Sequence, residues 1–302
     1  MNATIKDYLM LHLIVLIWGF TAILGLLISL PAIELVFYRT LIAAIGVAGL
    51  FLLKKKNLLM PFPDMIKVTG VGFVIAMHWI LFFWSAQVST ASVCLAGMAT
   101  TSLWTAFVEP LFNRTKIKWY EVGLGLMVIS GLLVIFSFES GYWLGLSMAL
   151  ASSFLAAVFS VLNSKLAHKH HPYQITFYEM AGACLFTLLF MPIYSNFMTD
   201  EGLKLTWVGY DWFWLFILGG ICTVYAFSVS VELMKRLSVF SINLTINLEP
   251  VYGIILAVLI FGESEKMTPQ FYLGTGIILV SVLTYPVLNY INKRRKPVRP
   301  LG

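Results

Sequence analysis

Long apolar runs follow one another along almost the whole chain, and they restrict the fold more than any other feature. A helix that crosses a lipid bilayer needs about 20 apolar residues, and ten runs of about that length are separated mostly by short polar loops. Only 11% of the residues are charged, whereas a soluble domain carries about 25%. The sequence therefore predicts an all-α, polytopic membrane protein with ten transmembrane helices. Their expected ranges are Asp7–Ser29, Ala32–Leu53, Met65–Gln87, Ala91–Phe112, Tyr120–Phe138, Tyr142–Ala167, Tyr173–Tyr194, Asp211–Leu233, Ser238–Phe261 and Phe271–Ile291.

The lysines and arginines predict how these helices are oriented. Cytoplasmic loops of membrane proteins carry an excess of Lys and Arg, and here the basic residues concentrate in every second loop and near the C-terminus. The other side of the bilayer receives only Lys204 and Lys266, together with several acidic residues. Both termini are therefore expected in the cytoplasm, in a multi-pass protein of the cytoplasmic (inner) membrane. The net charge of +6 then reflects orientation and does not indicate nucleic-acid binding.

Two segments of the first half of the chain recur in the second half. Leu35–Arg39 resembles Ile175–Glu179, and Gly123–Ser130 resembles Gly274–Ser281. The chain is thus expected to consist of two five-helix repeats, residues 1–140 and residues 141–302. Because five is an odd number, the second repeat would enter the membrane in the opposite orientation. Inverted repeats are typical of secondary transporters, which bind substrate between the repeats near the middle of the membrane.

Four short motifs occur in the order and at the spacing of a known transporter family. They are Trp18-Gly19, Phe37-Tyr38-Arg39, Leu248-Glu249-Pro250-Val251 and Gly262-Glu263. With these motifs the chain resembles the EamA-type family of the drug/metabolite transporter superfamily over nearly its whole length. The resemblance implies ten helices, two cytoplasmic termini and export of small metabolites such as amino acids through a central cavity. The segment Ala99–Thr105 departs from the Leu-x-Pro-Leu element that many members carry there, which leaves the substrate open.

The polar stretch Ser241–Tyr252 in the ninth run is the strongest candidate for a binding site. An ionisable group inside the membrane indicates function by default, and Pro250 leaves a carbonyl free in the preceding turn. On a continuous helix the polar residues fall on two faces, one with Thr245, Glu249 and Tyr252 and the other with Asn243 and Asn247. We expect the face with Glu249 to line the cavity, where its carboxylate suits a proton or a cationic substrate. If the helix is rotated, the asparagines contact the substrate, and a polar pair that joins two helices is the remaining alternative.

Side chains of other helices are predicted to line the same cavity. Aromatic rings would supply apolar walls around a few polar contacts, as in most small-molecule sites. His78 is either a proton carrier, since histidine titrates near neutrality, or a neutral ring that is hydrogen-bonded to a neighbouring helix. The predicted substrate-binding residues outside the ninth run are Thr101, Trp104, His78, Trp79 and Tyr225.

Four charged residues are assigned structural or gating roles instead. Arg39 and Glu179 occupy matching positions in the two repeats, and Glu109 corresponds to Glu263. An isolated arginine inside the membrane costs at least about 2.5 kcal/mol. Arg39 is therefore expected to extend outward toward Glu34 as a structural anchor, and substrate binding is the alternative role.

These patterns together predict a secondary transporter that exports a small organic metabolite, either an amino acid or a drug-like compound, by alternating access between the repeats. Nucleotide-binding and hydrolytic motifs are absent, so an ion gradient or facilitated diffusion would drive transport, and protons are the candidate coupling ion. Beyond the substrate and the lipid bilayer, no cofactor, metal or nucleic acid is expected. The alternative is an integral-membrane enzyme or a lipid-handling protein that acts on a hydrophobic substrate, which would need paired acids or histidines at one membrane face.

Overall fold

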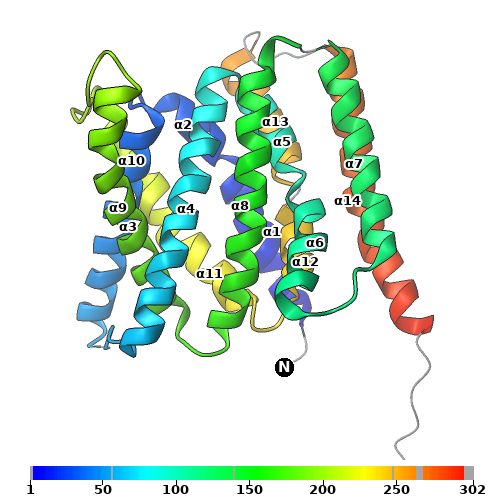
Figure 1. Cartoon of the computed structure of the whole chain (residues 1–302), viewed down its shortest axis with the longest axis horizontal. Coiled ribbons are helices and arrows are strands. Elements are labelled where there is room, and N and C mark those ends of the chain that lie inside the picture. Colours follow the sequence, from blue (N-terminus) through cyan, green and yellow to red (C-terminus); the bar gives the residue numbers. More distant parts are fainter. Residues whose placement is uncertain (1–2, 56, 139, 247, 263–267, 296–302) are drawn as a thin grey trace, which may run out of the picture.

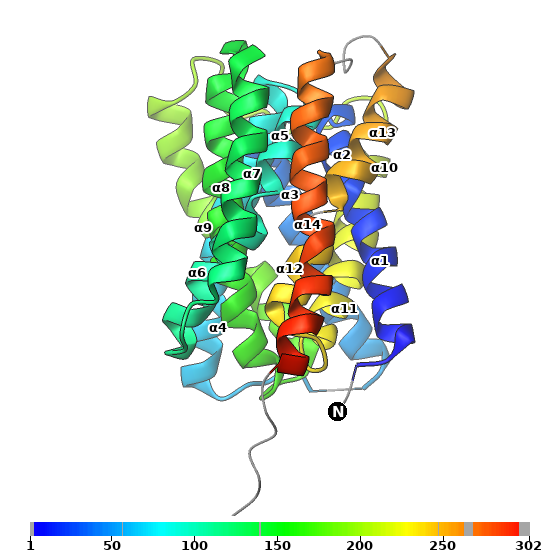
Figure 2. The same cartoon turned by 90° about the vertical axis from the view of Figure 1, so that its right-hand side faces the viewer.

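The helices form one bundle, and both described ends of the chain lie at the same end of it. The computed structural model describes residues 3–55, 57–138, 140–246, 248–262 and 268–295. The first helix, α1 (Ile5–Gly19), begins at the end of the bundle where the last, α14 (Pro269–Arg295), finishes (Figure 1, Figure 2). This end is called the terminus side below, and the other end is called the opposite side.

Every regular element in the described ranges is a helix. The elements between the first and the last are α2 (Thr21–Leu27), α3 (Ala32–Leu53), α4 (Phe62–Val88), α5 (Ala91–Met98), α6 (Thr101–Asn113), α7 (Trp119–Phe138), η1 (Ser140–Tyr142), α8 (Trp143–Ala167), α9 (Pro172–Phe197), α10 (Asp211–Phe216), η2 (Ile217–Tyr225), α11 (Ala226–Leu233), α12 (Val239–Ile246) and α13 (Glu249–Phe261).

Among the described residues, seven helical segments are long and apolar enough to cross a membrane by length and composition. They are Ile5–Leu27, Ala32–Leu53, Phe62–Val88, Ala91–Asn113, Trp143–Ala167, Pro172–Phe197 and Asp211–Leu233. The prediction of an all-helical, multi-pass membrane protein is thereby confirmed.

Helices from the first and the second half of the chain interlock throughout the bundle. α3 packs against α9, α4 packs against α8 and α9, and α7 packs against α14. At the crossing of α4 and α9 the backbones touch, because a Cβ atom on Gly72 would overlap the carbonyl oxygen of Glu179 and one on Gly182 would overlap that of Thr69. Small residues at crossing points are the usual means of close approach between membrane helices. The two halves therefore share one packed interior.

Three of the helical segments are interrupted near their middle. The breaks separate α1 from α2, α5 from α6, and α12 from α13. Threonine hydroxyls bond to carbonyl groups at two of these breaks, since Thr21 donates to Trp18 over 2.7 Å and Thr100 donates to Gly97 over 2.9 Å. Irregular backbone at membrane depth is tolerated where it is buried in protein or lines a cavity. The breaks therefore indicate where a functional site lies.

The fourth irregularity is a π-helix, η2, which connects α10 to α11. Within it, Thr223 donates its hydroxyl to the carbonyl oxygen of Leu218, five residues earlier, over 2.8 Å. The carbonyl oxygen of Cys222 accepts a hydrogen bond from the indole Nε1 of Trp18 over 2.9 Å. Single π-helical turns are frequent at functional sites because their wider turns redirect backbone and side-chain groups.

Candidate functional site

A cavity lies among the interrupted helices, and both halves of the chain contribute to its walls. Residues of α1, α2, α3, α4, α5, α6, α8, α11, α12 and α13 line it. Most of the lining is apolar, with several tryptophan and phenylalanine rings. Besides hydroxyl groups, the polar lining residues are Arg39, His78, Asn163, Asn243 and Glu249. An apolar cavity with a few convergent polar groups is the usual form of a small-molecule site.

Arg39 is the fixed positive charge of the cavity. Its residue is only 3% exposed, its guanidinium carbon lies 3.7 Å from the ring centroid of Trp79, and its Nε donates to the hydroxyl of Thr223 over 2.9 Å. The expectation that Arg39 extends outward toward Glu34 is wrong, because Glu34 instead accepts a hydrogen bond from the backbone N–H of Lys204 over 3.0 Å. The aromatic face and the hydroxyl stabilise the guanidinium inside the protein.

Glu249 places a carboxyl group in the same cavity. It is the first residue of α13, where the partial positive charge of a helix N-terminus favours a carboxylate, and it is 7% exposed. Arg39 and Glu249 interact electrostatically across the cavity but do not form an ion pair in this structure.

The break between α12 and α13 changes which polar residues face the cavity. A continuous helix would place Asn243 and Glu249 on different faces, yet both line the cavity, and they belong to two separate helices, α12 and α13. Thr245 donates its hydroxyl to the carbonyl oxygen of Ser241 over 2.9 Å and does not line the cavity. Tyr252, expected beside Glu249, packs next to Gly19 of α1 instead. Asn247 lies outside the described residues.

Two predicted cavity residues of α6 have different surroundings. Thr101 lines the cavity and donates its hydroxyl to the carbonyl oxygen of Met98 over 2.7 Å. Trp104 lies outside the cavity lining and packs edge-on against Phe154, with 5.4 Å between the ring centroids. In the next turn of α6, Thr105 accepts a hydrogen bond from the amide nitrogen of Asn243 over 2.8 Å, so α6 positions the polar end of α12.

The aromatic predictions also separate into two groups. Trp79 lines the cavity beneath Arg39. Tyr225 is 37% exposed, and its hydroxyl reaches the sulfur of Met10 at 3.4 Å, so it lies away from the cavity lining. From the same π-helix, Thr223 accepts the hydrogen bond of Arg39 instead.

His78 lines the cavity and is hydrogen-bonded to a neighbouring helix. Its Nδ1 lies 2.8 Å from the hydroxyl oxygen and 2.9 Å from the carbonyl oxygen of Ser152 on α8. Its ring also packs against Phe159, with 5.2 Å between the ring centroids. This geometry matches the hydrogen-bonded alternative and fixes the ring against the cavity wall.

The charges assigned to structure or gating do not form one cluster. Glu109 is half-buried near the end of α6 and interacts electrostatically with Lys118 and Glu121. Glu179 is completely buried in α9 beside Asn163 of α8. Glu263 lies outside the described residues.

Sequence reasoning placed the helix that contains α11 at the cavity, but it missed the wall that α8 contributes and the residues with which α11 lines the cavity. Phe159, Ser160 and Asn163 line the cavity from α8, and Phe227 and Ser230 line it from α11. In the sequence, Ser160 and Asn163 are equally compatible with helix packing. Their spacing of about one helical turn, together with Phe159, is the only signal that could have placed them on one face.

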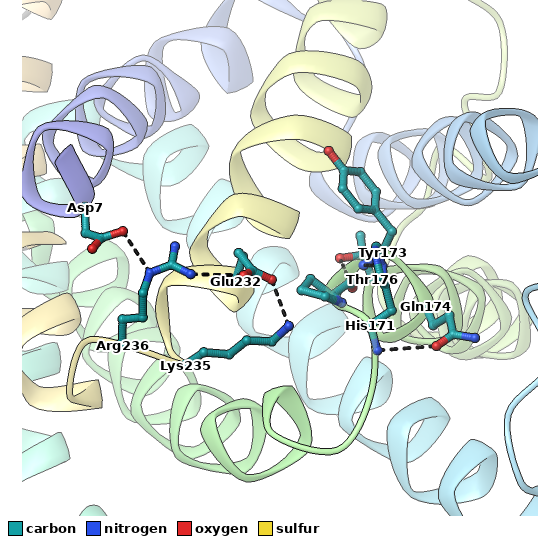
Figure 3. A network of polar contacts seen from close by, with 9 residues as sticks. Asp7, His171, Tyr173, Gln174, Thr176, Glu232, Lys235 and Arg236 are labelled. Atoms are coloured by element: carbon teal, nitrogen blue, oxygen red, sulfur yellow. Dashed lines mark hydrogen bonds and ion pairs between the residues drawn. The ribbon is translucent and has the colours of Figure 1, made fainter. Parts of the chain in front are cut away.

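An ionic network joins α1 to the end of α11 on the terminus side (Figure 3). Arg236 donates from Nε to Asp7 over 2.8 Å and from Nη1 to Glu232 over 3.1 Å, and Lys235 lies 2.9 Å from the same Glu232. Although partial burial acts in the other direction, the hydrogen bonds with Asp7 and Glu232 raise the pKa of Arg236. The network lies close to Met234, a cavity residue in the next position of the chain after α11.

The opposite side has its own polar contacts between the halves. The backbone N–H of Ser29, after α2, donates to the carboxylate of Asp211 at the start of α10 over 2.9 Å. Tyr38 donates its hydroxyl to the carbonyl oxygen of Leu205 over 2.6 Å. Both ends of the bundle are therefore held by polar contacts that cross between the halves.

Comparison with known proteins assigns the chain to a protein family. The model of the EamA-like transporter family matches residues 5–137 and 143–285, one match in each half of the chain. The chain belongs to the EamA-like transporter family. It is accordingly a multi-pass membrane transporter and not an enzyme.

Individual relatives of this EamA-family protein are transporters too. The pseudopaline exporter CntI of Pseudomonas aeruginosa is 30% identical over 183 residues, which cover 58% of this chain and 61% of that protein. An uncharacterized transporter of Archaeoglobus fulgidus is 25% identical over 293 residues, covering 93% of this chain and 96% of that protein. A solved crystal structure superposes with a TM-score of 0.70 at 18% identity, over 98% of this chain and all of that one, and it shows the fold alone.

Proposed function

We propose that this EamA-family protein is a secondary transporter of a small zwitterionic metabolite of the amino-acid type. The observation that carries the proposal is the pair Arg39 and Glu249. One ionisable group comes from each half of the chain, both line one aromatic cavity, and they do not form an ion pair with each other. A ligand with a carboxylate and an ammonium group would satisfy both.

The lining residues suit the two ends of such a substrate. The guanidinium of Arg39 can bind a carboxylate through two parallel hydrogen bonds. The carboxylate of Glu249 would accept hydrogen bonds from the ammonium group, and the side-chain oxygen of Asn243, which lacks a partner among the described residues, offers another acceptor. Buried charges are costly unless they are paired, so a substrate that pairs with both groups would offset that cost.

The apolar part of the cavity suits an apolar substrate side chain. The rings of Trp79, Phe159 and Phe227 pack against one another, with 6.1 Å between the centroids of Trp79 and Phe227 and 6.2 Å between those of Phe159 and Phe227. Rings in this arrangement form one continuous apolar wall. We therefore place amino acids with aliphatic or aromatic side chains first among the substrates.

Alternating access between two inverted five-helix repeats is the proposed mechanism, with ten transmembrane helices and both termini in the cytoplasm. The interlocked packing of the two halves supports it, as does the position of both described chain ends on one side (Figure 1). Opening one side requires only that the polar contacts of that side break while those of the other side persist. The relative that exports pseudopaline supports export as the direction, across the inner membrane of a bacterial cell.

Counterflow in proteoliposomes tests the proposal. Vesicles loaded with unlabelled L-leucine or L-phenylalanine should take up the labelled amino acid transiently, and protein-free vesicles should not. L-Leucinamide lacks the carboxylate and 4-methylpentanoate lacks the amine, so each should compete less well than L-leucine. The proposal is wrong if folded protein gives no counterflow with any zwitterionic amino acid, or if the two analogues compete as well as L-leucine.

A further inference from the structure

Glu179 is a buried carboxyl group that the proposed substrate site does not use. Its residue is 0% exposed on α9, and neither of its carboxyl oxygens has a hydrogen-bond partner among the described residues. It is the counterpart of Arg39 in the repeat, since Leu35–Arg39 matches Ile175–Glu179. The same position thus carries a positive charge in one half and an acid in the other.

The helices around Glu179 supply no counter-charge. α9 packs against α3, α4, α8 and α11, and among the described residues four charged or titratable side chains of these helices are bonded elsewhere. Arg39 bonds to Thr223, His78 to Ser152, Lys165 to the carbonyl oxygen of Phe112, and Glu232 to Lys235 and Arg236. The backbone of Gly72 lies directly against that of Glu179 and leaves no space for another side chain there.

The neighbour of Glu179 is Asn163, which lines the cavity from α8. Asn163 is itself 0% exposed, and both of its amide atoms also lack a hydrogen-bond partner in the described part of the chain. A carboxylate that is buried without a charge partner or hydrogen bonds is strongly destabilised, and such groups take up a proton instead. Protonation also gives the carboxyl group a donor that the amide oxygen of Asn163 can accept.

We propose that Glu179 carries the coupling proton of this transporter and that Asn163 connects it to the cavity. This inference rests on the proposed transport function. In one cycle the carboxylate takes up one proton from water on one side of the membrane, becomes neutral in the buried state and returns the proton to water on the other side. A zwitterion has no net charge, so exchange of one proton for one substrate moves one positive charge across the membrane. Transport would then respond to the membrane voltage as well as to the pH gradient.

Infrared spectroscopy of the purified protein tests the proton site without a substrate. The probe is the proton itself, exchanged for deuterium in D2O. The carbonyl-stretch band of protonated carboxylic acids should shift on exchange in wild type and in Glu249→Gln, and the part that belongs to Glu179 should be missing in Glu179→Gln. The band should change position in Asn163→Ala, which keeps the acid and removes its neighbour. An identical band in wild type and Glu179→Gln would overturn the inference.

Transport separates a failure of this inference from a failure of the proposed function. In proteoliposomes with labelled L-leucine, Glu179→Gln should keep counterflow and lose the accumulation that a pH gradient drives. The surface variant Glu201→Gln, which removes an exposed acid, should keep both. Accumulation that persists in Glu179→Gln overturns the inference while the transport function stands. If wild type itself gives no counterflow, the proposed function fails, and the infrared result still decides whether Glu179 holds a proton.

Discussion

The guanidinium of Arg39 lies 3.7 Å from the ring centroid of Trp79, and the two residues come from the neighbouring helices α3 and α4. The Nε of Arg39 is held by Thr223 of the π-helix. The charge is thus fixed from two directions before a ligand arrives. A site of this kind binds more tightly because little side-chain freedom remains to be lost.

Replacement of Trp79 by leucine should weaken substrate binding. A desolvated cation–π contact is worth about 2 kcal/mol, and a loss of about 1.4 kcal/mol lowers affinity about tenfold. Isothermal titration of L-leucine into purified Trp79→Leu should show that change. The matched control is Trp212→Leu, because Trp212 is 49% exposed and lies outside the cavity lining. Equal affinities in the two variants would show that the Arg39–Trp79 contact does not contribute to substrate binding.

Replacement of Glu249 by glutamine should reduce the preference for substrates with an ammonium group. Removing one partner of a buried charge pair costs about 2–5 kcal/mol, so counterflow of L-leucine should fall steeply. Competition by 4-methylpentanoate, which has no amine, should change little. The ratio of the two competition constants measures the effect, and a ratio equal to that of wild type would show that Glu249 does not contact the amine.

The bundle could be predicted from the sequence because its signals are local. Each apolar run and each polar loop is read directly along the chain, and helix formation in a membrane follows from the need to satisfy every backbone group within the segment. That Asn243 and Glu249 both line one cavity could not be predicted. It depends on a break between α12 and α13 that replaces the regular turn of a helix.

The partner of Arg39 was equally hidden from the sequence. Glu34 lies five positions away on the same helix and is the nearest acid in the sequence, but it bonds to the backbone of Lys204. The actual partner, Thr223, lies 184 positions away in the sequence and is presented by a π-helical turn that no local pattern marks. Contacts between distant helices depend on how the two halves pack, and local sequence patterns do not reveal that packing.

Removal of the ion pair between Arg236 and Asp7 should open the terminus side. The side chains of Arg236 and Asp7 are only 22% and 10% exposed, but Arg236 keeps its hydrogen bond to Glu232, so Asp7→Asn should shift the balance of conformations without unfolding the protein. The measurement is the rate at which a cysteine at Met234 reacts with a polar thiol reagent after Cys94, Cys184 and Cys222 have been replaced by alanine. The rate should rise in Asp7→Asn. The exchanged pair, Asp7→Arg with Arg236→Asp, should restore the slow rate, and an unchanged rate in Asp7→Asn would show that the pair does not close this side.

Replacement of Gly72 by alanine should destabilise the contact between α4 and α9. The added Cβ atom would overlap the carbonyl oxygen of Glu179, which belongs to a helix backbone and cannot move aside on its own. Overpacking of this kind costs about 1–3 kcal/mol, so the midpoint of thermal unfolding in detergent should fall. The matched control is Gly70→Ala on the same helix, where a Cβ atom meets nothing within 4 Å, and where alanine gains about 0.5–1 kcal/mol of helix stability over glycine. Gly70→Ala should therefore unfold at or above the wild-type temperature. If both variants unfold at the same temperature, the two backbones are not in direct contact at Gly72.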